Sequence, residues 1–82
     1  MRNETLNKKE VSELFRSVSG TGGFQGLIRK LQSQCDQPKG IIELDDDDLR
    51  RIPEYAFDAG QGGFQNRLIK IFGRVLGPKL GR

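Results

Sequence analysis

The residue types that most enzymes use for catalysis are scarce in this sequence. It contains no histidine, so the commonest general base and the commonest zinc ligand are both missing. The single cysteine, Cys35, and the serines have no evident neighbour that could activate a nucleophile. Pairs of acidic residues could exchange protons, but a chain of 82 residues has a thin core in which to tune their pKa values. The sequence therefore predicts a non-enzymatic protein with no cofactor and no small-molecule substrate.

The aspartate run Asp45–Asp48 is the motif closest to a metal site. Successive helical side chains point about 100° apart, so these carboxylates do not converge on one ion. The segment also lacks the glycine that an EF-hand loop has at its sixth position. We therefore predict no bound metal, and expect the acids to begin a helix, where they complement its dipole. Asp46 and Asp47 are candidate contacts for a basic partner.

Two glycine-rich segments repeat one another: GTGGFQGLIRKL at residues 20–31 and GQGGFQNRLIKI at residues 60–71. Such segments can form tight corners between helices, or a nest of N–H groups that binds phosphate. They lack the GK[ST] ending of a P-loop and the third glycine of a dinucleotide fingerprint, so a nucleotide site is not expected. Phe24 and Phe64 hold equivalent positions and are predicted to pair in the core. The residues that follow them, Gln25 and Gln65, either cap backbone groups locally or face a partner.

Basic side chains form the other candidate contact surface. The net charge is +3, and residues 59–82 contain no acid. Arg67, Lys70 and Arg74 are spaced i, i+3, i+7, which places them in one stripe along a helix. Arg29 and Lys30 fall on the outer side of the preceding helix. These cations are candidates for contact with nucleic acid or an acidic protein, or they simply keep a helix surface solvated.

Apolar spacing typical of amphipathic helices predicts helices over residues 7–19, 22–34, 45–59 and 62–76. Asn7 and Asp45 are the expected N-caps, and each is preceded by a leucine that can form a hydrophobic staple. We predict an all-α fold: a small four-helix domain spanning residues 1–82. It would be built from two tandem helix-turn-helix repeats, about 6–35 and 44–77, that cover each other's apolar faces. The tail 78–82 can be flexible.

Two segments fit this scheme less simply. Pro53 lies inside the third predicted helix, where it either kinks the helix or marks the start of a new one. Residues 37–43 include Ile41 and Ile42, which could form a short extended segment. Since no partner strand is evident, we expect a loop with two apolar anchors.

The sequence predicts a cytoplasmic protein that has no membrane contact. No apolar stretch approaches the ~20 residues that span a bilayer. The polar N-terminus lacks the apolar core of a signal peptide, and one cysteine cannot form an internal disulfide.

The segments GTGGFQGLIRKLQ and YAFDAGQGGFQNRLIKIFGRVLGPKLGR resemble segments of short proteins encoded by phages and other mobile elements. Among these, the chain is most similar to anti-CRISPR inhibitors, in its size, its lack of catalytic residues and its compact build. The resemblance implies a protein of the host-cell cytoplasm that binds a host effector complex, such as CRISPR–Cas, and blocks its access to DNA. Many such inhibitors are acidic DNA mimics, whereas this chain is basic overall; the acidic segment 43–58 could still imitate phosphate locally.

Two functions follow from these features. The first is a non-enzymatic inhibitor or adaptor that docks on a host protein or nucleoprotein complex through its glutamines, acidic residues and basic stripe. The alternative is a helix-turn-helix regulator that binds nucleic acid. In that case the basic residues would contact phosphates, and Gln25 or Gln65 would reach a base edge.

Overall fold

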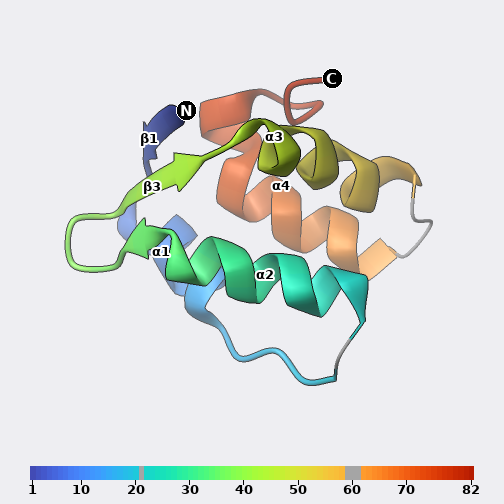
Figure 1. Cartoon of the computed structure of the whole chain (residues 1–82), viewed down its shortest axis with the longest axis horizontal. Coiled ribbons are helices and arrows are strands. Elements are labelled where there is room, and N and C mark those ends of the chain that lie inside the picture. Colours follow the sequence, from blue (N-terminus) through green and yellow to red (C-terminus); the bar gives the residue numbers. More distant parts are fainter. Residues whose placement is uncertain (21, 59–61) are drawn as a thin grey trace.

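The computed structural model describes residues 1–20, 22–58 and 62–82. Its elements, in chain order, are β1 (Arg2–Thr5), α1 (Lys8–Phe15), α2 (Gly23–Ser33), β2 (Cys35–Asp36), β3 (Ile41–Leu44), α3 (Asp46–Pro53), the π-helix η1 (Glu54–Asp58) and α4 (Gly62–Leu76). Figure 1 shows the helices stacked in layers, with the strands gathered at one end.

The prediction of an all-α fold is wrong, because the chain also forms a three-stranded antiparallel sheet with the strand order β1-β3-β2. In the central strand, Ile42 and Leu44 are buried while Ile41 and Glu43 are exposed, which is the alternation of a half-buried strand. The expected loop at residues 37–43 is therefore partly strand. Its main partner comes from the start of the chain, where Arg2 lies opposite Leu44 and Thr5 opposite Ile41.

The predicted helix starts agree closely with the structure. Asn7 and Asp45 are the N-caps of α1 and α3, and each forms a reciprocal capping box with the residue three positions later. Helix α1 ends at Phe15, four residues before the predicted end at 19. Gly20 has a positive φ of 89°, as expected of a turn glycine, but it lies beyond the end of this helix.

Pro53 ends α3 without breaking the helical path. Proline has no N–H to donate to the carbonyl of Leu49, and the chain continues directly into the wider turn of η1. The buried Ile52 and Ala56 keep this segment against the core. The predicted helix end at residue 59 lies outside the described residues.

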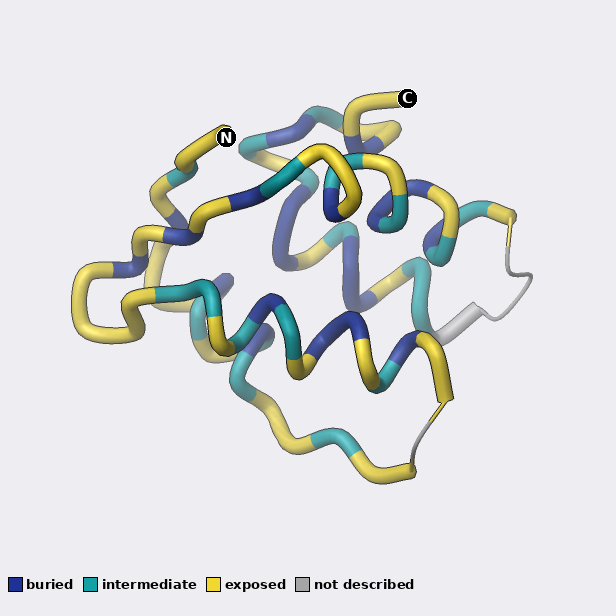
Figure 2. Tube along the Cα trace, in the orientation of Figure 1, coloured by how far each residue is buried: buried dark blue, intermediate teal, exposed yellow. Residues whose placement is uncertain are grey.

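The core is formed between the helices and one face of the sheet (Figure 2). Helix α4 is its centre: Leu68, Ile71 and Phe72 are fully buried, and α1 and η1 both pack against this helix. The predicted pairing of Phe24 with Phe64 is present as a stack that joins α2 to α4. Helix α1 packs more against α4 than against α2, so the two repeats interlock rather than forming separate hairpins.

The segment 78–82 folds back on the domain. Leu80 is 1% exposed and belongs to the core, and Arg82 pairs with Asp58. No helix within the described ranges combines the length and apolar character needed to cross a membrane.

Candidate functional site

Arg67, the first residue of the predicted basic stripe, lies in the interior. Its side chain is 6% exposed, and its NH2 group donates hydrogen bonds to the backbone carbonyls of Glu13, Leu14 and Arg16. These carbonyls are at the C-terminal end of α1, where a helix leaves acceptors unpaired. Burial, reinforced by the charge of Arg16, lowers the pKa of Arg67. The structure thus uses Arg67 as a cap that joins α4 to α1.

Arg74, the last residue of the stripe, also bonds to α1. Its guanidinium donates to both carboxylate oxygens of Glu10, at 2.8 and 3.2 Å, and to the carbonyl of Thr5 at 2.7 Å. Burial alone would raise the pKa of Glu10, but the hydrogen bonds from Arg74 and from the Asn7 N–H outweigh it and lower that pKa. The carboxylate of Glu10 therefore stays ionised beside the α1 N-cap.

Lys30 joins α2 to the start of α3. Its ammonium lies 2.6 Å from the carboxylate of Asp48, which is fully buried, and 3.2 Å from that of Asp45. The hydrogen bond to Asp48 is the main reason that the pKa of Lys30 is raised. Gln34 donates to the other oxygen of Asp48 at 2.8 Å. The buried member of the aspartate run, Asp48, is therefore held by Lys30 of α2 and by Gln34, the C-cap residue of that helix.

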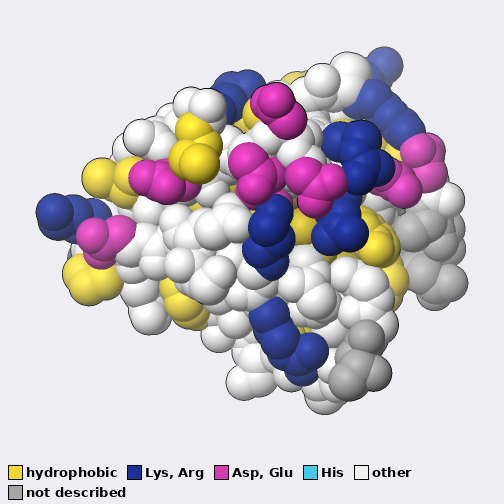
Figure 3. Space-filling view, viewed as in Figure 1, with side chains coloured by type: hydrophobic (Ala, Val, Ile, Leu, Met, Phe, Trp, Pro, Cys, Tyr) yellow, Lys and Arg dark blue, Asp and Glu magenta, His cyan; other side chains and the backbone are white. Residues whose placement is uncertain are grey.

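The exposed aspartates differ from each other. Asp47 pairs with Arg50 at 2.6 Å and Arg51 at 3.3 Å, so much of its charge is neutralised. Asp46 is exposed and forms no ion pair within the described part of the chain. Figure 3 shows acidic and basic side chains side by side on this face, which is formed by α2 and α3. No group of three or more potential metal ligands occurs among the described residues.

The remaining predicted contact residues lie at or near the surface. Gln25 is half-buried and folds back over its own turn: a Cβ placed on Gly22 would be 2.6 Å from its Oε1. Gln65 is half-buried on α4. Arg29 and Lys70 are exposed, and Arg29 reaches the carbonyl of Val18 at 3.5 Å. A partner contact through any of these residues stays a prediction.

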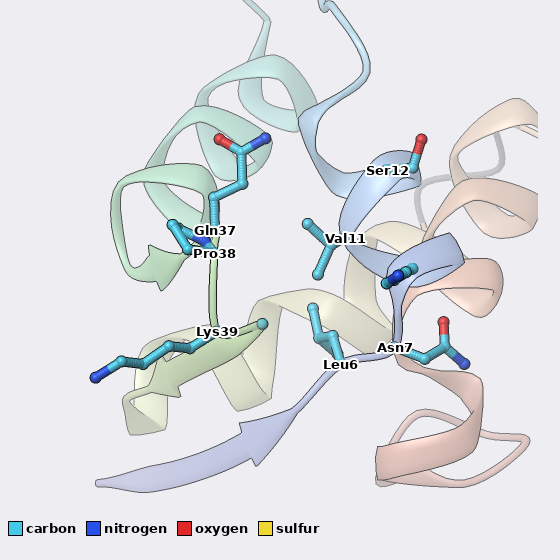
Figure 4. Close-up of a pocket in the computed structure, with 9 residues that line it drawn as sticks. Leu6, Asn7, Val11, Ser12, Gln37, Pro38 and Lys39 are labelled. Carbon is cyan, nitrogen blue, oxygen red and sulfur yellow. The ribbon is translucent and has the colours of Figure 1, made fainter.

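A cleft of about 660 Å³ lies between the first turns of α1 and the connection from β2 to β3 (Figure 4). Its lining residues are Leu6, Asn7, Lys8, Val11, Ser12, Gln37, Pro38, Lys39 and Gly40. No pattern in the sequence predicts a site at these residues. Two short segments far apart in the chain form the cleft, and the antiparallel pairing of β1 with β3 brings them together. The sequence feature that could have indicated this cleft is Gly40, because the backbone there needs a positive φ, which glycine adopts readily.

The chain was compared with protein-family models, with curated proteins and with solved structures, and none of the three comparisons gives a match.

Proposed function

We propose that this chain is a non-enzymatic binding protein that docks on a larger protein or nucleoprotein complex. The observation that carries the proposal is a set of exposed cations that form no ion pair with any described residue: Lys8, Lys9, Arg29, Lys39, Lys70 and Lys79. Most other cations are engaged within the fold. This is the case for Arg16, Lys30, Arg50, Arg51, Arg74 and Arg82.

Charges that form no ion pair within the fold are the ones available to a partner. Exposed unpaired charges steer the encounter between proteins and set which surfaces are compatible. A stable interface requires about 800 Å² of surface from each partner, and the domain has 4881 Å² of accessible surface in total. The fold can therefore supply a docking surface while keeping its structural ion pairs.

The nucleic-acid alternative has less support. It relies on the basic stripe of α4, but Arg67 is buried against α1 and Arg74 is bonded to Glu10. Of the three residues in that stripe, only Lys70 is exposed and also forms no ion pair with a described residue. In the specific form of the proposal, drawn from the resemblance to anti-CRISPR inhibitors, the partner is a cytoplasmic effector complex whose access to nucleic acid is blocked.

Lysine footprinting would test the proposal. The tagged chain would be cross-linked in cells to identify a partner, and the complex would be reconstituted from purified components. The acetylation rate of each lysine would then be compared by mass spectrometry, with and without the partner. We expect protection of some of the unpaired lysines. Lys30 is the internal control, because its ammonium is already held by Asp48 and should react slowly in both states.

Two results would contradict the proposal. One is that no protein forms a stable complex with the purified chain. The other is that the chain binds DNA or RNA alone, with an affinity that falls steeply as salt is added, which would favour the nucleic-acid alternative.

A further inference from the structure

Backbone hydrogen bonds fix the two sides of the cleft beside α1 relative to each other. The Leu6 N–H donates to the Gly40 carbonyl at 2.7 Å, and the Gly40 N–H donates to the Asp36 carbonyl at 2.7 Å. Gly40 has a φ of 73°, and a Cβ on it would lie only 2.6 Å from the Leu6 carbonyl oxygen. The β2–β3 connection is therefore fixed closely against the chain that leads into α1. A binding surface that exists before its ligand arrives loses less ordering entropy on binding.

Part of the inner surface of this cleft is apolar. Figure 4 shows the side chains of Leu6 and Val11 pointing into the space between α1 and the connection. Leu6 is 4% exposed and belongs to the core, whereas Val11 is half-buried and retains accessible surface. Pro38 adds an exposed apolar ring on the other side. An apolar side chain of a partner would be buried against these residues, and the loss of its contact with water would favour binding.

The edge of the cleft is positively charged. Lys8 and Lys39 line it, both are exposed, and neither forms an ion pair with the described residues. Figure 4 shows Lys39 extending from the connection, on the side away from Leu6 and Val11. No carboxylate lines the cleft. Of the acids beside these segments, Glu10 is bonded to Arg74, and Asp36 accepts from the Lys39 backbone N–H at 3.3 Å.

Given the docking function proposed above, on which this inference rests, we infer that the cleft binds an acidic peptide segment carrying one apolar side chain. The apolar side chain would lie on Val11, next to Leu6, and the flanking carboxylates would pair with Lys8 and Lys39 at the outer edge of the cleft. The lining contains no aromatic residue on which a base could stack and no arginine for a bidentate contact with guanine. The apolar side chains of Leu6, Val11 and Pro38 match an apolar side chain of a peptide, whereas a phosphate group would use only the polar and basic part of the lining. These features favour a protein segment over nucleic acid.

The inference can be tested by NMR titration of the full ¹⁵N-labelled chain with short synthetic peptides. The main probe is Asp-Glu-Leu-Glu-Asp with blocked ends; the comparison probes are Asp-Glu-Ser-Glu-Asp and Lys-Lys-Leu-Lys-Lys. We expect the leucine-containing acidic peptide to shift the amide signals of Lys8, Val11 and Gly40. The serine peptide should bind about tenfold more weakly, since it lacks the apolar contact. The basic peptide should cause no shifts there.

Matched variants separate the cleft from general electrostatic attraction. The double variant Lys8→Glu/Lys39→Glu should lose at least about tenfold in affinity for the acidic peptide. Lys70→Glu/Lys79→Glu changes the net charge equally and should retain near wild-type affinity, because neither residue lines the cleft. Val11→Thr keeps the shape of the side chain while adding a hydroxyl, and should weaken the leucine peptide more than the serine peptide. Lys8→Glu places an acid in the first turn of α1, which favours the helix dipole, so folding is retained.

Several outcomes would overturn the inference. The first is equal loss of binding in both double variants, since that would mean attraction by net charge alone. The second is an absence of shifts at the cleft with the acidic peptide, and the third is stronger binding there of a thymidine oligonucleotide or inorganic phosphate. The proposed docking function would survive these results if footprinting showed a partner protecting lysines elsewhere, such as Lys70. It would fail by itself if no partner protein were found at all.

Discussion

The rings of Phe24 and Phe64 stack with their centroids 3.9 Å apart and their planes 10° from parallel. These residues follow the two glycine-rich segments at equivalent positions of the sequence repeat. Their contact joins the beginning of α2 to the beginning of α4. The repeat therefore brings two helix starts together inside the domain, and the phenylalanines are structural residues rather than contacts for a partner.

Removing Phe24 should destabilise the domain strongly. Phe24 is 6% exposed, and Phe24→Ala is expected to cost about 3–5 kcal/mol of unfolding free energy through lost burial and a cavity. Phe64 is half-buried, so Phe64→Ala should cost less. Urea denaturation followed by circular dichroism would measure both. The double variant should lose about 0.5–1.5 kcal/mol less than the sum of the single losses. Strict additivity would mean that the stack contributes nothing beyond burial.

The Glu10–Arg74 pair should make stability sensitive to acid. The pKa of Glu10 is lowered below its ordinary value of 4.5 in the folded chain. The pair's contribution is therefore complete above that ordinary value, and is lost as the pH falls through the lower folded pKa. In Arg74→Gln the burial of Glu10 remains while its main donor is weakened. The pKa of Glu10, measured by NMR, should then rise, and acid unfolding should begin at a higher pH.

Arg16→Gln is the control for this experiment, because Arg16 pairs with Glu13 rather than Glu10. An unchanged titration of Glu10 in Arg74→Gln would show that the capping box alone keeps this carboxylate ionised.

Gly40→Ala should cost more than Gly77→Ala. Both glycines have a positive φ, of 73° and 94°, so each alanine pays a similar conformational cost of roughly 1–2 kcal/mol. At Gly40 the new Cβ would also lie 2.6 Å from the Leu6 carbonyl oxygen, whereas at Gly77 it would meet nothing within 4 Å. Thermal unfolding of the two variants would compare them. Equal losses would mean that the connection is free to move away from Leu6, and that the cleft beside α1 is not rigid.

Charge reversal should affect the basic stripe of α4 unevenly. Arg67→Glu would place a carboxylate among the carbonyls of Glu13, Leu14 and Arg16, and should prevent stable folding. Lys70→Glu alters an exposed side chain and should change stability by no more than about 0.5 kcal/mol. Thermal melts followed by circular dichroism would show this contrast. If both variants melted like the wild type, the buried position of Arg67 would be contradicted.

The parts of the fold that depend on local sequence were predictable. Asn7 and Asp45 cap their helices through residues only three positions away, and the apolar spacing of α2 and α4 repeats within each helix. The sheet was missed because its outer strand β1, with the sequence RNET, has no apolar alternation. It pairs with a segment that is distant in the chain, and no local pattern shows such pairing.

The candidate site was harder to predict for the same reason. Helical spacing placed Arg67 and Arg74 on one face of α4, but it could not show that α1 covers this face. Once α1 is in place, both arginines bond to it. Lys8 and Lys39 could not be predicted as site residues, because each is an ordinary surface lysine in its own segment. They line one cleft only because the sheet brings their segments together.

The central position of β3 has a consequence for the order of assembly. The β2–β3 hairpin closes a loop of a few residues, whereas the pairing of β1 with β3 must close a loop that includes α1 and α2. Closing the longer loop costs more chain entropy, and contacts between distant residues slow folding. We expect the hairpin to form early and the N-terminal strand to join it late. The cleft, which needs both, would be among the last parts of the molecule to take shape.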